Sequence, residues 1–235
     1  MKRGDFIRLE YTGRVSSTGE IFDLTSEEEA KKQGLFKSGY KYGPVLVIMG
    51  AGMIIPGVEK QLETMKPGDE KEFAVKPEEA FGLRNPALIK IVSVSQFRRS
   101  EKPFNPVPGM FVTINGRQAR IQSVSGGRVR VDFNHPLAGK ELKYRIRVTG
   151  TITKPQEQAN SILEYYRVSG EATLETGKLG IKTEKEMPKP ARKLLRETIM
   201  EWVKGIKTVE FSSSKKTPSE NSKNKKTGDS TKNST

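Results

Sequence analysis

The sequence contains no cysteine and only one histidine, His135, among its 235 residues. The absence of cysteine excludes disulfides, thiol redox chemistry and zinc sites built from cysteine. A single histidine also disfavours a histidine-rich metal site and Ser–His or Cys–His nucleophilic catalysis. We therefore expect a protein that uses no metal and no other cofactor.

Long hydrophobic runs are missing as well. The longest apolar stretch, 45–55, contains two glycines and is far shorter than the roughly 20 residues that a membrane-spanning helix needs. The N-terminal residues, MKRGDFIRLEY, are too polar for the apolar part of a signal peptide. These features predict a cytoplasmic protein without a membrane segment.

Hydrophobic residues are scarce and basic residues abundant. The hydrophobic fraction is 34%, and 42 Lys and Arg against 28 Asp and Glu give a net charge of +14. Residues 212–235 carry six Lys, two acidic residues and no large apolar side chain, which predicts a disordered basic tail. Residues 84–134 add nine basic and two acidic residues, so most of the positive charge belongs to these two segments.

Residues 1–83 have the pattern of a small α+β unit. Ile7, Leu9 and Tyr11 alternate with polar residues, as in a half-buried strand. Further strands are expected at 20–24, 45–49 and 70–75. Thr25 and Glu28 form a capping-box pattern that predicts a short helix over 26–33. The spacing of Val58, Leu62 and Met65 predicts a second short helix, which ends at Pro67-Gly68.

Residues 84–134 differ in character and predict a separate antiparallel β unit. Ile89, Ile91 and Val94 are assigned to one strand, and 112–114, 119–124 and 129–133 to three more. Asn115-Gly116 and Gly126-Gly127 are typical of the hairpin turns between them. A long alternating strand at 142–152 then returns to the first unit, so that unit is expected to comprise 1–83 and 135–154.

Residues 155–211 predict a third region, a small α/β module. Helices are expected near 155–165 and 191–203, and strands near 172–174, 179–182 and 206–211. The apolar stripe of the second helix includes Trp202. This stripe is most simply the core of the module itself, and a homodimer interface is the alternative.

Three features of the sequence allow two interpretations each. Asp23 ends an apolar strand, and on position alone a capping role is favoured over a binding role. Met53, Ile54 and Ile55 lie on a loop, where a place in the core is favoured over the lining of a pocket. Four arginines of the insert alternate with apolar residues, which indicates a solvated sheet face or, as the alternative, a nucleic-acid surface. They are Arg117, Arg120, Arg128 and Arg130.

Several short motifs follow one another in a characteristic order. They are Tyr11-Thr12-Gly13, Gly19-Glu20-Ile21-Phe22-Asp23, Gly57-Val58-Glu59, Met65-Lys66-Pro67-Gly68-Asp69 and Ala80-Phe81-Gly82. Together they resemble the FKBP-type peptidyl-prolyl isomerases. The segment 84–134, closed by the sequence NHPLAG, resembles the insert-in-flap domain of the SlyD branch. The residues after 155 resemble the extension of the long archaeal members.

The resemblance implies a fold and a set of site residues. The fold is an antiparallel sheet on a short helix, interrupted by the β insert. The implied catalytic residues are Tyr11, Asp23, Ile55, Phe81 and Tyr144, and the implied substrate-binding residues are Phe22, Val45, Met53, Ile54 and Val58. Three positions depart from the common family pattern, since Val58 replaces Trp, Phe81 replaces Tyr and Tyr144 replaces Phe. The metal-binding tail of SlyD is absent.

The same resemblance implies a function. The protein is expected to isomerise X-Pro bonds of unfolded or partly folded polypeptides in an apolar pocket, with the insert acting as a chaperone domain. The alternative is a ribosome- or RNA-associated factor that retains the scaffold, with polyanion contacts through the basic insert and tail. That alternative predicts a steeply salt-dependent affinity for RNA.

Overall fold

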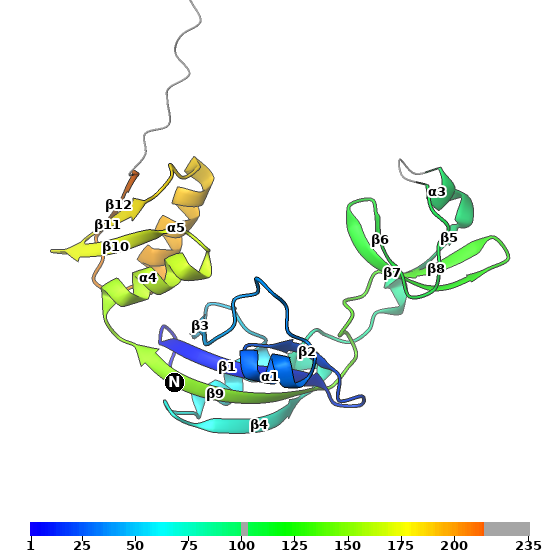
Figure 1. Cartoon of the computed structure of the whole chain (residues 1–235), viewed down its shortest axis with the longest axis horizontal. Coiled ribbons are helices and arrows are strands. Elements are labelled where there is room, and N and C mark those ends of the chain that lie inside the picture. Colours follow the sequence, from blue (N-terminus) through cyan, green and yellow to red (C-terminus); the bar gives the residue numbers. More distant parts are fainter. Residues whose placement is uncertain (100–102, 214–235) are drawn as a thin grey trace, which may run out of the picture. The chain divides into compact units, whose positions relative to one another are not determined.

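The computed structural model describes residues 1–99 and 103–213 (Figure 1). It divides into two compact units, Met1–Thr153 and a second that begins at Lys154. The prediction of a disordered tail falls, from residue 214 onward, outside the described residues. Sheets in both units are combined with a few short helices, so the predicted α+β class is confirmed.

The first unit is built on a five-stranded antiparallel sheet in the order β2-β1-β9-β4, with β3 also pairing with β1. Its strands are β1 (Phe6–Val15), β2 (Ile21–Leu24), β3 (Val45–Ile48), β4 (Glu70–Val75) and β9 (Leu142–Ile152). The long strand β9 lies after the insert in sequence and yet pairs with β1 along its whole length. The unit is therefore closed only when the chain returns from the insert.

One edge of β1 is shared by two strands that leave a gap between them. β3 pairs with β1 as far as Leu9, and β2 pairs with it from Thr12 onward. Thr25 fills this gap, because its N–H donates to the Tyr11 carbonyl at 3.0 Å and its Oγ1 accepts from the Tyr11 N–H at 2.9 Å. The segment after β2 is thereby attached beside Tyr11.

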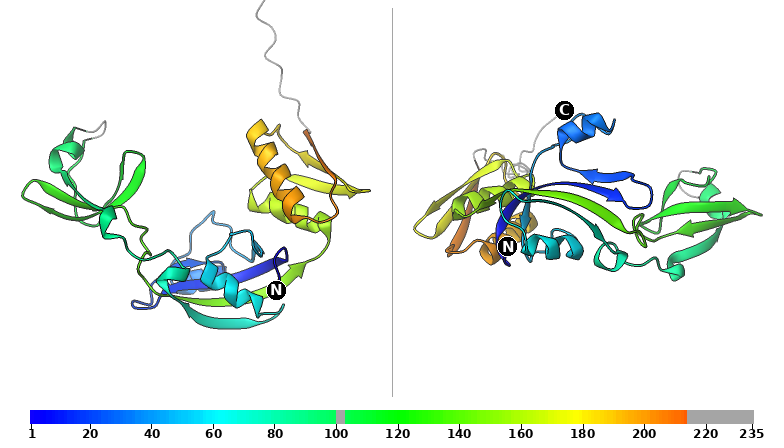
Figure 2. Two further views of the ribbon diagram at one scale, coloured as in Figure 1. Left: turned by 180° about the vertical axis from the view of Figure 1, so that it is seen from behind. Right: turned by 90° about the horizontal axis from the view of Figure 1, so that it is seen from below.

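The core of this unit lies between the sheet and α2 (Pro56–Glu63). Val58 and Leu62 of α2 are fully buried against alternate residues of β1 and β9, among them Ile7 and Ile146. Pro56 suits the first turn of the helix, where a backbone N–H has no partner to lose. The other helix, α1 (Glu27–Lys32), lies on the opposite side of the sheet (Figure 2).

The predicted capping box of α1 is displaced by one residue. The N-cap is Ser26, whose Oγ accepts from the Glu29 N–H at 3.3 Å. Thr25 is not available as a cap, because its hydroxyl is engaged with the backbone of Tyr11. Local pattern alone could not separate two adjacent hydroxyl residues that are both followed by Glu three positions later.

The insert forms its own four-stranded antiparallel sheet, in the order β5-β8-β7-β6. Its elements are β5 (Ile89–Ser93), α3 (Val94–Arg98), β6 (Phe111–Ile114), β7 (Arg117–Ser125) and β8 (Arg128–Asp132). Val94 was expected in a strand but begins α3, because the Ser93 hydroxyl caps a helix by accepting from the Ser95 N–H at 3.2 Å. A separate apolar cluster that includes Phe97, Ile121 and Val131 forms the insert core.

The segment that enters the insert and the segment that leaves it are joined by one buried carboxylate. Asp132 forms an ion pair with Arg84 and accepts from the Gln122 side chain at 2.9 Å and from the Asn134 N–H at 2.9 Å. Burial alone would raise the pKa of Asp132, but the hydrogen bonds from Asn134 and the charge of Arg84 outweigh it and lower the pKa. Asn85 and Asn134 also bond to each other, at 2.8 and 3.0 Å.

The second unit contains a three-stranded sheet and two helices. They are α4 (Pro155–Tyr165), β10 (Gly170–Glu175), β11 (Lys178–Thr183), α5 (Lys189–Trp202) and β12 (Thr208–Ser213). β12 continues two residues past the predicted end of the module, in register with Lys182 and Thr183. Leu195, Ile199 and Val203 are buried, so most of the α5 stripe belongs to the core of this unit. None of the helices in the described part of the chain is long and apolar enough to cross a membrane.

Candidate active site

Tyr11 and Asp23 form the polar part of the candidate site. The Tyr11 hydroxyl donates to Oδ2 of Asp23 at 2.6 Å. The adjacent strands β1 and β2 bring them together, with Asp23 opposite Gly13 in the sheet. Burial, the hydrogen bond to Asp23 and the negative charge of Asp23 all raise the pKa of Tyr11. Tyr11 therefore stays a hydrogen-bond donor throughout the physiological pH range. Asp23 accepts from Tyr11 and does not cap a helix, because the N-cap of α1 is Ser26.

Tyr144 of β9 is at the centre of an aromatic group. Its ring meets Phe22 edge-on with centroids 5.7 Å apart, and it lies 6.2 Å from the ring of Tyr11 and 6.4 Å from that of Phe73. Burial, with a smaller contribution from the charge of Asp23, raises the pKa of Tyr144 to about 12. Three neighbouring strands and β2 thus contribute to one apolar wall with a polar corner.

The loop from β3 into α2 supplies the aliphatic part. Ile54 and Ile55 are half-buried and pack against the core, whereas Val58 is fully buried beneath them. Ile55 is the N-cap residue of α2. Among the described residues its backbone N–H donates to no acceptor. A substrate carbonyl that reaches this loop can therefore bond to that N–H without displacing an internal partner.

Phe81 follows β4 and is half-buried against the same core. Its ring stacks on His135 with centroids 4.2 Å apart and an interplanar angle of 1°. Nδ1 of His135 accepts from the Leu137 N–H at 3.2 Å, and burial lowers the pKa of the imidazole. Phe81 is therefore positioned by a residue that stands on the other side of the insert in the sequence.

The structure brings together nine of the ten predicted site residues. Eight belong to the main apolar cluster or pack against it, and Asp23 joins them through Tyr11. Val45 is one of the eight and pairs with Leu9 in the sheet. Met53 does not belong to this cluster, and its sulfur instead accepts from the Ile48 N–H at 3.4 Å.

Sequence reasoning missed three residues that shape this site. Thr25 bonds to the backbone of Tyr11, Phe73 stacks on Tyr144 and His135 stacks on Phe81. The alternation of β4, which directs Phe73 and Val75 to the same face, was a usable signal for Phe73. Nothing local indicated that His135 meets Phe81, because 53 residues separate them.

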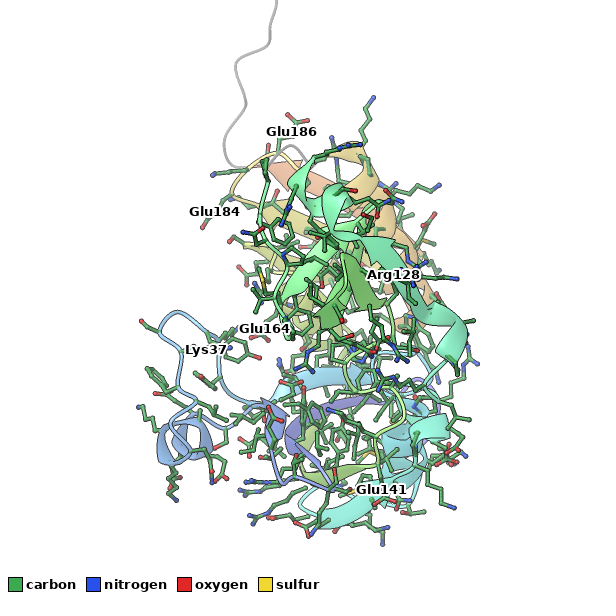
Figure 3. All side chains as sticks on the ribbon, turned by 90° about the vertical axis from the view of Figure 1, so that its right-hand side faces the viewer. Lys37, Arg128, Glu141, Glu164, Glu184 and Glu186 are labelled. Atoms are coloured by element: carbon green, nitrogen blue, oxygen red, sulfur yellow. The ribbon has the colours of Figure 1, made fainter. Side chains whose placement is uncertain are left out.

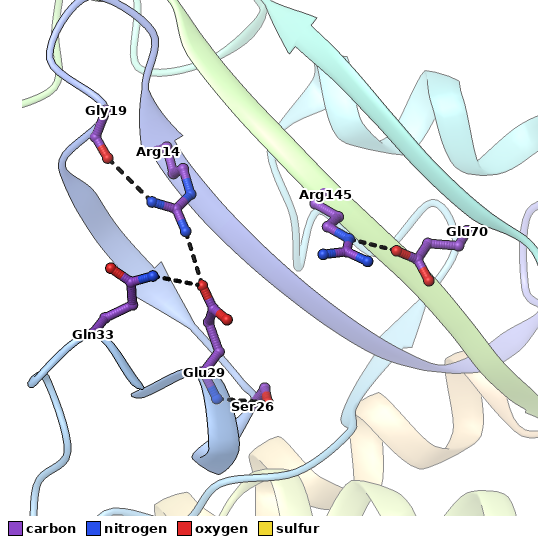
Figure 4. Close-up of polar contacts among 7 residues, drawn as sticks. All are labelled: Arg14, Gly19, Ser26, Glu29, Gln33, Glu70 and Arg145. Carbon is purple, nitrogen blue, oxygen red and sulfur yellow. Dashed lines mark hydrogen bonds and ion pairs between the residues drawn. The ribbon is translucent and has the colours of Figure 1, made fainter. Parts of the chain in front are cut away.

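The opposite face of the sheet is charged. A hollow of about 390 Å³ there is lined by both signs, including Lys143 and Glu72. Arg14 joins β1 to Glu29 of α1 at 2.9 Å and reaches the Gly19 carbonyl at 3.4 Å, while Arg145 pairs with Glu70 (Figure 4). The hollow is lined by five acidic and five basic residues, and four ion pairs join eight of them. This face therefore has no excess charge for a ligand, and the pair of Arg14 with Glu29 holds α1 in place. Within the described residues, no group of three or more potential metal ligands is present.

The arginines predicted to share one face of the insert are divided between two. Arg120 and Arg130 are exposed and alternate with the buried residues Ala119, Ile121, Val129 and Val131, so they lie on the outer face together with Arg128. Arg117 is two residues from Ala119 in β7 and therefore belongs to the opposite face, the one with the buried residues. Its guanidinium lies 5.2 Å from the ring centre of Phe133.

Comparison with known proteins accounts for both parts of the first unit. Residues 1–98 match the family model described as FKBP-type peptidyl-prolyl cis-trans isomerase, and residues 90–137 match the model described as FKBP26, IF domain. The chain is 36% identical over 148 residues to a short-type peptidyl-prolyl cis-trans isomerase of Methanocaldococcus jannaschii, an alignment that covers 63% of this chain and 92% of that protein.

Two bacterial relatives agree. An FKBP-type 16 kDa peptidyl-prolyl cis-trans isomerase of Escherichia coli is 30% identical over 136 residues, covering 57% of this chain and 86% of that protein. The SlyD isomerase of Helicobacter pylori is 35% identical over 128 residues, covering 53% of this chain and 69% of that protein. The chain therefore belongs to the FKBP-type peptidyl-prolyl cis-trans isomerase family and is an isomerase of X-Pro peptide bonds in polypeptides.

Proposed function

We propose that the apolar cluster around Val58 is the pocket in which the X-Pro bond rotates. Ile54, Ile55 and Phe81 hold the prolyl ring above Val58, and the Ile55 N–H donates to a substrate carbonyl. Asp23 and Tyr11 face the polar side of the rotating amide. The observation that carries the proposal is the half-buried apolar wall beside a tightly bonded Tyr11–Asp23 pair.

The mechanism needs no nucleophile and no proton transfer. Rotation about a peptide bond costs about 18–20 kcal/mol because resonance must be broken. The twisted amide has less charge separation than the planar one. An apolar pocket therefore destabilises the planar ground state relative to the transition state, which is differential binding. With Tyr11 and Tyr144 protonated well above neutral pH, the pocket keeps one charge state throughout the physiological pH range.

The assignment is tested with Asp23→Ala and Phe81→Ala in a proline-limited refolding assay. We expect each variant to lose about tenfold or more in kcat/KM, which corresponds to about 1.4 kcal/mol of transition-state stabilisation. Leu83→Ala is the matched control, because Leu83 is exposed and only two residues from Phe81. Folded variants at both sites with wild-type activity would show that the pocket lies elsewhere.

We further propose that the insert holds polypeptides for the pocket, as a chaperone domain. A hollow of about 1170 Å³ in the insert exposes apolar side chains, and Phe111 and Met110 are 62% and 39% exposed. Other apolar residues lining it are Phe97, Phe104, Val112 and Ile114. A chain held there raises the local concentration of X-Pro bonds at the pocket.

A double substitution, Met110→Ser with Phe111→Ser, tests the insert without deleting it. We expect a loss of several-fold in kcat/KM on an unfolded protein substrate and almost none on a short proline peptide. Equal losses on both substrates would refute a holding role. The homodimer through 155–211 remains a prediction that sedimentation tests. The ribosome or polyanion contact is a prediction that a salt-dependent RNA titration tests, and the cytoplasmic location also stays a prediction.

A further inference from the structure

The loop 33–44, between α1 and β3, exposes an unusual number of apolar side chains; we call it the aromatic loop. Leu35, Phe36 and Tyr40 are 41%, 45% and 49% exposed. Figure 3 shows this loop, marked by Lys37, beside α1. Large exposed apolar side chains gathered in one short segment are typical of a contact surface, and aromatic residues are enriched at such surfaces.

Tyr42 organises the aromatic loop from within. Its ring stacks on Phe36, with centroids 5.6 Å apart and planes 17° apart, and meets Tyr40 edge-on at 4.8 Å. The Tyr42 hydroxyl accepts from the Lys37 N–H at 2.9 Å. Lys31 Nζ lies 5.1 Å from the ring centre of Phe36. The exposed rings are thus held in place before any ligand arrives, which lowers the entropy cost of binding one.

The C-terminal end of the aromatic loop is attached beside Tyr11. The Gly43 N–H donates to the Thr25 carbonyl at 2.8 Å. Thr25, which is only 4% exposed, makes the backbone contacts to Tyr11 described above. Tyr40 is also among the groups that add, after burial and Asp23, to the raised pKa of Tyr11. The aromatic loop is therefore continuous with the polar corner of the proposed pocket.

We propose that the aromatic loop is a second contact area of the isomerase, which takes an apolar side chain of the polypeptide close to the X-Pro bond. Phe36 and Tyr40 are the residues that determine this preference. The inference rests on the proposed pocket, because the occupant is the chain that the pocket already holds. An extended chain advances about 3.3 Å per residue, so residues within a few positions of the proline extend beyond the pocket.

A peptide series tests the preference. Each peptide contains one Ala-Pro pair in a background of Ser and Lys. A single Phe is placed at one of the three positions before the Ala or at one of the three positions after the Pro. We expect the wild-type protein to isomerise the best Phe peptide about ten times more efficiently, in kcat/KM, than the peptide without Phe. Phe36→Ser and Tyr40→Ser should each reduce that ratio to about threefold or less and change the rate on the peptide without Phe by less than twofold.

Two further variants complete the design. Tyr40→Phe keeps the ring and should keep most of the preference. Leu194→Ser, at a 50% exposed position in the second unit, should leave the ratio unchanged. If Phe36→Ser and Tyr40→Ser lower the rates on all peptides equally, or change none of the ratios, the aromatic loop has only a structural role and the inference is wrong. A wild-type protein that is inactive on every peptide would overturn the proposed pocket as well.

Discussion

Gly13 allows a sharp test of the geometry beneath the site. A Cβ added at Gly13 would lie 2.5 Å from Cζ and 2.9 Å from Cε2 of Phe22. Because Gly13 is inside β1 and its φ is not positive, Ala suits the backbone there, so the whole effect of Gly13→Ala comes from the ring. Phe22 must move, and we expect this shift to disturb its edge-on contact with Tyr144.

The expected magnitude follows from this contact. Overpacking costs about 1–3 kcal/mol, and we expect Gly13→Ala to lower the free energy of unfolding of the first unit by that amount. In a Phe22→Ala background the obstacle is gone, and the same change should cost almost nothing or stabilise by about 0.4–1 kcal/mol. If Phe22 contacts the substrate, as the family resemblance implies, the isomerase activity of Gly13→Ala should fall about tenfold.

The assay is urea unfolding followed by far-UV circular dichroism and tyrosine absorbance, with proline-limited refolding for activity. Trp202, the single tryptophan, belongs to α5 in the second unit, so its fluorescence serves as an internal control. Gly150→Ala is the matched variant, because Gly150 is also in a strand and a Cβ there meets nothing within 4 Å. An equal cost of Gly13→Ala with and without the Phe22 ring would refute the reasoning.

Four further predictions concern charge and capping. Since burial raises the pKa of Tyr144 from 10.0 to about 12, its contribution of roughly 2–3 kcal/mol is present below pH 10 and is lost as the pH rises to 12; Tyr144→Phe should flatten that part of an alkaline unfolding profile. Asp132→Ala removes the acceptor that Arg84, Gln122 and Asn134 share, and it should lower the free energy of unfolding by about 1–3 kcal/mol. Glu78→Ala is the control, because Glu78 is exposed, and it should change the free energy of unfolding by less than about 0.5 kcal/mol. Because the pKa of Asp132 is lowered, its stabilisation is present above about pH 4 and is lost at lower pH, so Asp132→Asn should reduce the acid sensitivity of unfolding. Ser26→Ala should cost about 1 kcal/mol as the loss of an N-cap, and a larger loss from Glu28→Ala would contradict the placement of the cap.

Much of the fold could be predicted because its signals are local. The alternation at Ile7, Leu9 and Tyr11 reflects the period of a strand with one buried face, and β1 is found there. Val58 and Leu62 follow the period of a helix, and α2 buries both. The turns at Asn115-Gly116 and Gly126-Gly127 separate β6, β7 and β8 as expected. Short-range periodicity therefore determined most element positions, with errors at the N-cap of α1 and at α3, where Val94 was expected in a strand.

The candidate site was predicted chiefly by the resemblance. On the residues alone, a cap was favoured for Asp23 and core for Ile54 and Ile55. The structure makes Asp23 the acceptor of the Tyr11 hydroxyl and leaves both isoleucines half-buried. These outcomes depend on which strands become neighbours, and a residue's own sequence surroundings do not specify that.

The sequence by itself determined the α+β class, the absence of thiol and multi-histidine chemistry, and the concentration of positive charge in the insert and tail. The tertiary structure alone decided that β9 returns across the insert to pair with β1, that Thr25 bonds to Tyr11 instead of capping α1, and that His135 stacks on Phe81. The physical reason is range: composition and periodicity act over a few residues, whereas these contacts join positions 14 to about 140 residues apart. Such pairings are stable only once loop closure, burial and sheet pairing occur together.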